Sequence, residues 1–133
     1  MASALYPFAK AVFLSGCIDM MNDVIEAILI NENYVYSTLH ECLDDIRSYQ
    51  VGSLHVLTGR DIYSGVFDAD DATFTAVTSS YKVSGVVIYQ NKNNSDSQSI
   101  PIAYIDCSLA PITPNGSNIT VQWDNGPNKI FAL

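Results

Sequence analysis

Apolar and polar positions alternate near the end of the chain, and this alternation predicts a strand. Ile119, Val121 and Trp123 fall on one face with polar residues between them, which is the two-residue period of a half-buried strand. Residues 124–128 form a turn-like run rich in Asp, Asn, Gly and Pro, and apolar residues return at 130–133. The pattern predicts a final hairpin with the Trp123 side chain in the core.

Most of the remaining chain shows the same strand-like pattern, with turn residues between the segments. Gly59 and Gly65 interrupt the shorter segments, and an Asp-rich turn follows them. Residues 91–99 are polar throughout, so we expect an exposed loop there. The strands expected from this pattern cover residues 24–30, 54–58, 61–63, 66–67, 73–77, 83–90 and 100–106.

Helical spacing is confined to the N-terminal third of the chain. One amphipathic helix is predicted near the N-terminus, with Pro7 in its first turn and Gly16 at its end. A second helix is predicted from Thr38, because Thr38 and Glu41 have the spacing of a capping box. The two apolar stripes are Leu5, Phe8, Ala9, Val12 and Phe13 in the first helix, and Leu39, Cys42, Leu43 and Ile46 in the second.

These elements predict a mainly β fold. Short strands separated by Gly, Pro and Asn turns favour an antiparallel β-sandwich, here of about seven strands, with two short helices in the N-terminal third. A chain of 133 residues is the size of one domain, and 48% hydrophobic residues suffice for a core. We therefore expect residues 1–133 to form a single domain.

The chain is acidic but carries few charges overall. Charged residues make up 15%, against about 25% in typical soluble domains. The formal net charge of -8 argues against direct binding to nucleic acid, although it can also serve solubility alone. With eight Tyr and five Phe, the exterior must present many uncharged side chains. Such a surface suits contacts between proteins.

The cysteines and the apolar runs argue against several further classes. Cys17, Cys42 and Cys107 are odd in number and widely spaced, so neither a disulfide scaffold nor a zinc site is expected. We expect them to be reduced, buried thiols of a protein made in a reducing cytoplasm. The apolar run at residues 27–30 is too short to span a membrane, and residues 1–7 lack the features of a signal peptide.

Candidate chemistry is sparse. Asp68, Asp70 and Asp71 are candidates for a calcium site, but a turn capped by Asp side chains explains them better. His40 and His55 are interpreted as ordinary polar positions, since no G-x-S-x-G or phosphate-binding Gly loop is present. A carboxylate site for sugar-polymer hydrolysis would need acids that nothing in the sequence brings together. We expect no catalytic residue, no enzyme activity and no cofactor.

Several segments together resemble a group of small structural proteins of tailed bacteriophages. The resemblance covers most of the chain, and its motifs are structural rather than catalytic. It implies a virion component made in the host bacterial cytoplasm, whose partners are the major capsid protein or other virion proteins. The segments that carry it are GVFDADDATFTAV at residues 65–77, residues 87–89, 102–106, 114–116 and 119–133, together with residues 6–16 and the Asp44-Asp45 pair.

Among virion components, we favour a homo-oligomeric capsid decoration (cement) protein. An acidic domain fits the outer surface of a capsid, away from the packaged DNA. Phe8, Ile130, Phe131 and Leu133 are the candidate contact residues, because an apolar chain end is expected to be held in a sheet or against a partner. The alternatives are a neck or tail component and, from another class, a carbohydrate-binding module that uses Trp123.

Overall fold

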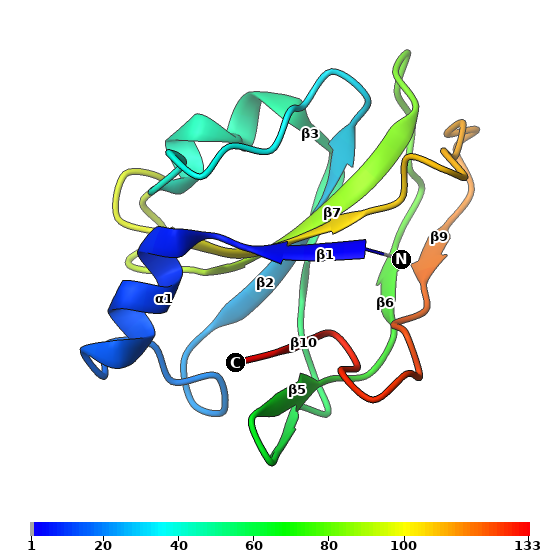
Figure 1. Cartoon of the computed structure of the whole chain (residues 1–133). Helices are drawn as coiled ribbons and strands as arrows, with labels where there is room; N and C mark the ends of the chain where they lie inside the picture. Colours follow the sequence, from blue (N-terminus) through cyan, green and yellow to red (C-terminus); the bar gives the residue numbers. More distant parts are fainter. Residues whose placement is uncertain (1) are drawn as a thin grey trace.

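A five-stranded antiparallel sheet organises the computed structural model, which describes residues 2–133 (Figure 1). Every residue of the two central strands, β2 and β7, is buried, so both faces of the sheet are covered at its centre. Their runs of Val and Ile suit this position. The strands, in the order in which they pair, are β1 Ala2–Leu5, β8 Ile100–Asp106, β7 Val83–Gln90, β2 Ile25–Asn31 and β3 Gln50–Val56.

Two smaller antiparallel sheets complete the fold, and they lie beside and below the main sheet in Figure 1. The hairpin between β4 and β5 turns at Ser64 and Gly65, whose φ angles of 50° and 78° are those of a type I′ turn. Because the main sheet and both small sheets are antiparallel, the prediction of a mainly β, antiparallel fold is confirmed. One small sheet contains β4 Asp61–Tyr63, β5 Val66–Asp68 and β10 Phe131–Ala132, and the other contains β6 Ala72–Phe74 and β9 Ile119–Val121.

The predicted C-terminal hairpin is wrong, because β9 and β10 do not pair with each other. β9 pairs with β6, and β10 pairs with β5. After β9, Trp123 holds the chain against the β5–β6 connection: its indole Nε1 donates to the Asp70 carbonyl at 2.9 Å, and its backbone N–H donates to Asp71 Oδ1 at 3.2 Å. The Trp123 side chain is buried, as predicted.

The N-terminal helix is confirmed as α1, Pro7–Leu14. Pro7 occupies its first turn, where no intrahelical N–H is needed, and Gly16 follows its C-cap with a φ of 78°. Leu5 belongs instead to β1, a strand that the sequence pattern did not predict. β1 lies at the edge of the main sheet, and its four residues are too few to reveal an alternation.

The helix predicted from Thr38 is wrong. The segment contains two 3₁₀ turns, η1 Leu43–Asp45 and η2 Arg47–Tyr49, and Thr38 lies in a preceding turn. The capping arrangement is displaced by four residues, because the Asp45 carboxylate accepts hydrogen bonds from the backbone N–H groups of Glu41 at 3.1 Å and Cys42 at 3.4 Å. The backbone N–H groups of Leu43 and Asp44 donate instead to the Ser99 carbonyl at 3.0 Å and the Asp96 carbonyl at 3.2 Å, so bonds to a distant loop take the place of helical bonds.

The buried residues form one continuous hydrophobic cluster. Glu26 is the one buried acid among residues 2–133, and its carboxylate accepts hydrogen bonds from Tyr89 Oη at 2.7 Å and Asn91 Nδ2 at 3.1 Å. The cysteines are free, as predicted, but Cys17 is exposed and the other two are only half-buried, so the prediction of buried thiols is wrong for Cys17. Within residues 2–133, none of the helices has the length and apolar character needed to cross a membrane.

Candidate functional site

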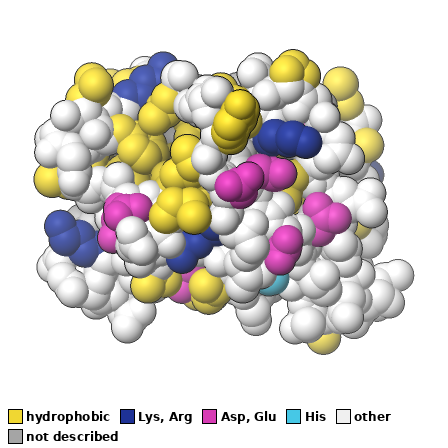
Figure 2. Space-filling model, turned by 90° about the horizontal axis from the view of Figure 1, so that it is seen from below, with side chains coloured by type: hydrophobic (Ala, Val, Ile, Leu, Met, Phe, Trp, Pro, Cys, Tyr) yellow, Lys and Arg dark blue, Asp and Glu magenta, His cyan; other side chains and the backbone are white. Residues whose placement is uncertain are grey.

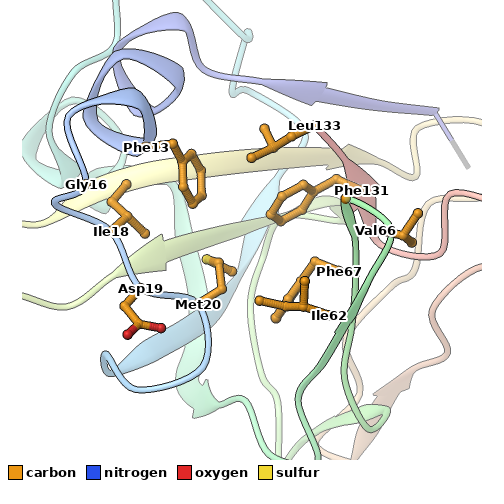
Figure 3. A pocket seen from close by; sticks show the side chains of 11 residues that line it. Phe13, Gly16, Ile18, Asp19, Met20, Ile62, Val66, Phe67, Phe131 and Leu133 are labelled. Carbon is orange, nitrogen blue, oxygen red and sulfur yellow. The ribbon is translucent and has the colours of Figure 1, made fainter.

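An apolar groove of about 370 Å³ opens between α1, the loop that follows it, the β4–β5 hairpin and the C-terminus (Figure 3). We call it the terminal groove. Figure 3 shows side chains from these four segments pointing toward a common space. The lining residues that define the groove are Phe13, Ile18, Met20, Ile62, Phe131 and Leu133.

Aromatic rings make up the inner wall of the terminal groove. The ring centroids of Phe13 and Phe131 are 6.4 Å apart, and those of Phe67 and Phe131 are 5.3 Å apart. Phe67 and Phe131 are buried, whereas Ile62 and Leu133 on the rim remain 46% and 66% exposed. The inner wall therefore belongs to the core, and the rim offers apolar surface to a partner.

The loop that carries Ile18 and Met20 is held by a network around Asp19. The Asp19 carboxylate accepts hydrogen bonds from Asn22 Nδ2 at 2.7 Å and from the Met21 backbone N–H at 3.0 Å. These bonds lower the pKa of Asp19, with the Asn22 side chain as the largest cause. Because the loop is fixed in this way, its apolar side chains are positioned before any partner binds.

The apolar surface continues beyond the terminal groove. A neighbouring hollow of about 290 Å³ shares Phe13 and Leu133 with it and adds Leu14, which is 90% exposed. In Figure 2, which views the molecule from below, hydrophobic side chains gather left of centre around a hollow, with acidic side chains mainly to their right. Exposed apolar side chains that gather around a groove in this way suit an interaction surface.

The predicted contact residues divide into two pairs. Ile130 and Phe131 are 3% exposed and stabilise the chain's own core, whereas Phe8 is 38% exposed and Leu133 is 66% exposed. Leu133 lies at the terminal groove, and Phe8 is not among its lining residues. Contact through these four residues stays a prediction, in which Leu133 is the member best placed to touch a partner. Sequence reasoning missed the groove residues Ile18, Met20 and Ile62, which no local pattern joins to the C-terminus.

The acids proposed as a calcium site do not converge. Among residues 2–133, no group of three or more His, Cys, Asp or Glu side chains is arranged to hold a metal ion. Asp71 Oδ1 accepts the Trp123 backbone N–H, and the Asp70 backbone N–H donates to the Thr58 carbonyl at 2.9 Å. Asp68 lies within β5, opposite Asp61. The interpretation as a capped turn therefore describes this segment better.

The two histidines lie in different surroundings. His40 Nδ1 is 2.8 Å from Tyr34 Oη, so it takes part in a hydrogen-bonded chain of tyrosines. The ring of His55 packs on Phe74 at 5.8 Å, and its Nε2 is buried without a hydrogen-bond partner among the described residues. The sequence predicted ordinary polar positions, and in the structure both side chains are half-buried.

A second hollow, of about 430 Å³, lies where β8 ends and β7 begins. We call it the tyrosine hollow, and its defining residues are Glu32, Tyr34, Tyr36, Ser84, Tyr104 and Asp106. Sequence reasoning predicted a tyrosine-rich contact surface but not this site. The available signal was the two-residue spacing of Tyr34 with Tyr36 and of Tyr104 with Asp106, which places each pair on one side of an extended chain.

Hydrogen bonds between side chains hold the tyrosine rings in place. Tyr6 Oη is 2.7 Å from Tyr34 Oη, and the Tyr36 hydroxyl donates to the Leu5 carbonyl at 2.8 Å. Burial raises the pKa of Tyr34 to about 12, and it raises the pKa of Tyr104, with the Asp106 carboxylate as a further cause. The rings are therefore neutral, ordered surfaces at ordinary pH.

The terminal groove and the tyrosine hollow are the two surfaces from which a function can be argued. No protein-family model, no curated protein and no solved structure matches the chain. A functional proposal must therefore be based on the geometry of these two surfaces and on the sequence itself.

Proposed function

We propose that this chain is a non-catalytic structural protein that binds other protein subunits through the terminal groove, and that it decorates the outside of a bacteriophage capsid. The observation that carries the first part is the groove itself. Its preformed apolar walls meet an exposed apolar rim at Ile62 and Leu133. The resemblance of the sequence to phage structural proteins supports the second part.

The physical basis of the proposal is the burial of the rim. Apolar surface that leaves water on association contributes about 25 cal/mol per Å², and buried side chains of Leu and Ile are the usual source of it. Leu14, Ile62 and Leu133 are all at least 46% exposed in the isolated chain. A partner that covered the terminal groove and the neighbouring hollow would remove all three from water.

The net charge supports a position on the outside of the particle. With a formal charge of -8, the chain would be repelled by packaged DNA and suits a surface that faces solvent. A modest contact is sufficient there, because a capsid lattice repeats it and a homo-oligomer engages several copies at once. The partner proposed for the groove is the major capsid protein, and self-association would increase the avidity.

The copy number of the chain in purified particles tests the location. A decoration protein should be present in hundreds of copies, whereas a neck or tail component would be present in a ring of about six or twelve. Quantitative mass spectrometry against the major capsid protein distinguishes the two. A ring-sized number would contradict decoration and favour the neck or tail alternative, and absence from particles would contradict both.

Variants of the rim test the groove. Leu133→Asp and Ile62→Asp should each weaken binding to particles assembled without this protein by at least about tenfold, since a charge would be buried in an apolar contact. The matched control is Leu109→Asp, because Leu109 is fully exposed and is not among the groove residues. Equal binding by all three variants, with circular dichroism unchanged, would contradict a role for the terminal groove.

A further inference from the structure

The tyrosine hollow joins one end of the main sheet to the segment that follows β2. It lies at the end of the main sheet where Asp106 of β8 pairs with Gly85 of β7. The buried Ser84 forms part of its floor. Three of its six defining residues stand on these paired strands, which hold side chains more precisely than loops do, and the other three belong to the segment after β2.

The tyrosine rings present an ordered aromatic surface to the hollow. Tyr36 and Tyr104 are nearly parallel, with an angle of 14° between their planes and 6.1 Å between their centroids. Tyr34 meets Tyr104 edge-on, at 5.3 Å and 64°. Tyr104 lies across Gly85, where a Cβ atom would approach its Cε1 to 2.5 Å. The glycine therefore allows the ring to lie flat against the sheet.

Two carboxylates stand beside these rings without a basic side chain to pair with them. Asp106 Oδ1 accepts the Ser108 backbone N–H at 2.8 Å, and Glu32 Oε1 accepts only a long bond of 3.5 Å from the Lys82 backbone N–H. Neither acid forms a salt bridge within residues 2–133. The hollow is lined by no Lys or Arg. It is therefore negatively charged, and each carboxylate keeps one oxygen free of these bonds.

We propose that the tyrosine hollow binds the guanidinium group of an arginine side chain presented by a partner protein. A guanidinium is planar, so it stacks on an aromatic ring while its N–H groups donate to carboxylates. An ammonium group would gain the charge attraction but not the planar stacking. That the arginine belongs to a partner protein rests on the proposed function. The site itself shares no lining residue with the terminal groove.

Binding of a small arginine probe tests this site. The probe is N-acetyl-arginine amide, and its matched control is N-acetyl-citrulline amide, which has nearly the same shape but no charge. In low salt, the arginine probe should shift the NMR signals of the Tyr36 and Tyr104 rings in the millimolar range. The citrulline probe should leave them unchanged, because it lacks the cation that the carboxylates attract.

Isosteric variants assign the charge effect to the two acids. Glu32→Gln and Asp106→Asn should each weaken binding of the arginine probe by about two- to fivefold, as expected for an ion pair that is accessible to solvent. Both amides can still accept the backbone hydrogen bonds of the native acids, so the fold should be retained. Asp124→Asn, which removes an exposed acid that is not among the hollow residues, should leave the affinity unchanged.

Three outcomes would overturn the proposal. The first is equal binding of the citrulline probe, the second is affinity unchanged in both isosteric variants, and the third is no shift with the arginine probe. Ring shifts caused by N-acetylglucosamine oligosaccharides instead would identify a saccharide site. Failure here is separable from failure of the proposed function, since Leu133→Asp should still bind the arginine probe even where it no longer binds particles.

Discussion

At the scale of single residues, Gly85 leaves no room for an added methyl group beside the neighbouring strand. An Ala Cβ there would meet both the Tyr104 ring and the Ile105 carbonyl oxygen, the latter at 3.0 Å. We expect Gly85→Ala to lower the free energy of unfolding by about 1 to 3 kcal/mol, as overpacking does, in urea titrations. Gly126→Ala is the control, because its nearest contact of 3.4 Å is ordinary and it should change stability by less than about 0.5 kcal/mol. Equal stability of the two variants would contradict the close contact.

The charge of Asp106 should be visible in the titration of Tyr104. Burial and then the Asp106 carboxylate raise the pKa of Tyr104, because a negative neighbour disfavours the tyrosinate. Asp106→Asn removes that charge, so the pKa of Tyr104 should fall toward its ordinary value. An NMR titration of the ¹³C-labelled tyrosine ring measures this change. A pKa unchanged from the native chain would show that the carboxylate does not face the ring.

At the scale of elements, the two-residue strand β10 anchors the C-terminus. Phe131 is 3% exposed and contacts two other aromatic rings, whereas Leu133 is 66% exposed. Phe131→Ala should therefore cost about 3 to 5 kcal/mol of stability, and Leu133→Ala less than about 0.5 kcal/mol, by thermal or urea unfolding. A small effect of Phe131→Ala would contradict its place in the core. The same difference makes Leu133 a better probe of binding than truncation of the whole C-terminal segment.

Sequence patterns predicted the strands β7 and β8 and the N-terminal helix accurately, but failed at the Thr38 segment and the C-terminal hairpin. The predicted ranges 83–90 and 100–106 match β7 and β8, because continuous β-branched and apolar runs suit strands buried on both faces. The prediction for the Thr38 segment was wrong because the Leu43 and Asp44 backbone N–H groups bond to the carbonyls of the 91–99 loop, and such bonds depend on residues distant in sequence. The C-terminal hairpin was wrong for the same reason, since the partner of β9 is β6.

The candidate site was predictable only in its chemical character. An uncharged, tyrosine-rich exterior and an apolar C-terminus were visible in the sequence, and both contribute to the surfaces described. The terminal groove could not be predicted, since it joins Phe13, Ile62 and Leu133 from three separate elements. Their proximity follows from the pairing of β10 with β5. This pairing places Phe131 opposite Phe67, more than sixty residues away in the sequence. No local pattern specifies that pairing.

At the scale of the whole molecule, buried tyrosines make stability sensitive to alkaline pH. Burial raises the pKa of Tyr34 from 10.0 to about 12 and also raises the pKa of Tyr6 and Tyr89. As pH rises above 10.0, the unfolded chain loses protons that the folded chain keeps. The free energy of unfolding should therefore be independent of these groups below that pH and decrease above it, as urea midpoints would measure.

Two variants separate buried tyrosines from exposed ones in this alkaline decline. Tyr34→Phe should reduce the decline, because it removes one of the groups that ionises only on unfolding. Tyr63→Phe should leave it unchanged, because the Tyr63 side chain is 79% exposed in the folded chain. A decline that Tyr34→Phe did not alter would show that ionisation of Tyr34 is not linked to unfolding.

The backbone hydrogen bonds of the C-terminal residues allow hydrogen exchange to report whether a partner occupies the terminal groove. The bonds that hold the C-terminus beside β5 include one from the Ile130 N–H to the Phe67 carbonyl at 3.1 Å and one from the Leu133 N–H to the Gly65 carbonyl at 2.9 Å. Opening of the chain end would free both amides to exchange with deuterium while those of β7 stay protected. A subunit seated against Leu133 would slow exchange at these two amides first, so their exchange rates would report binding on intact particles without an attached probe.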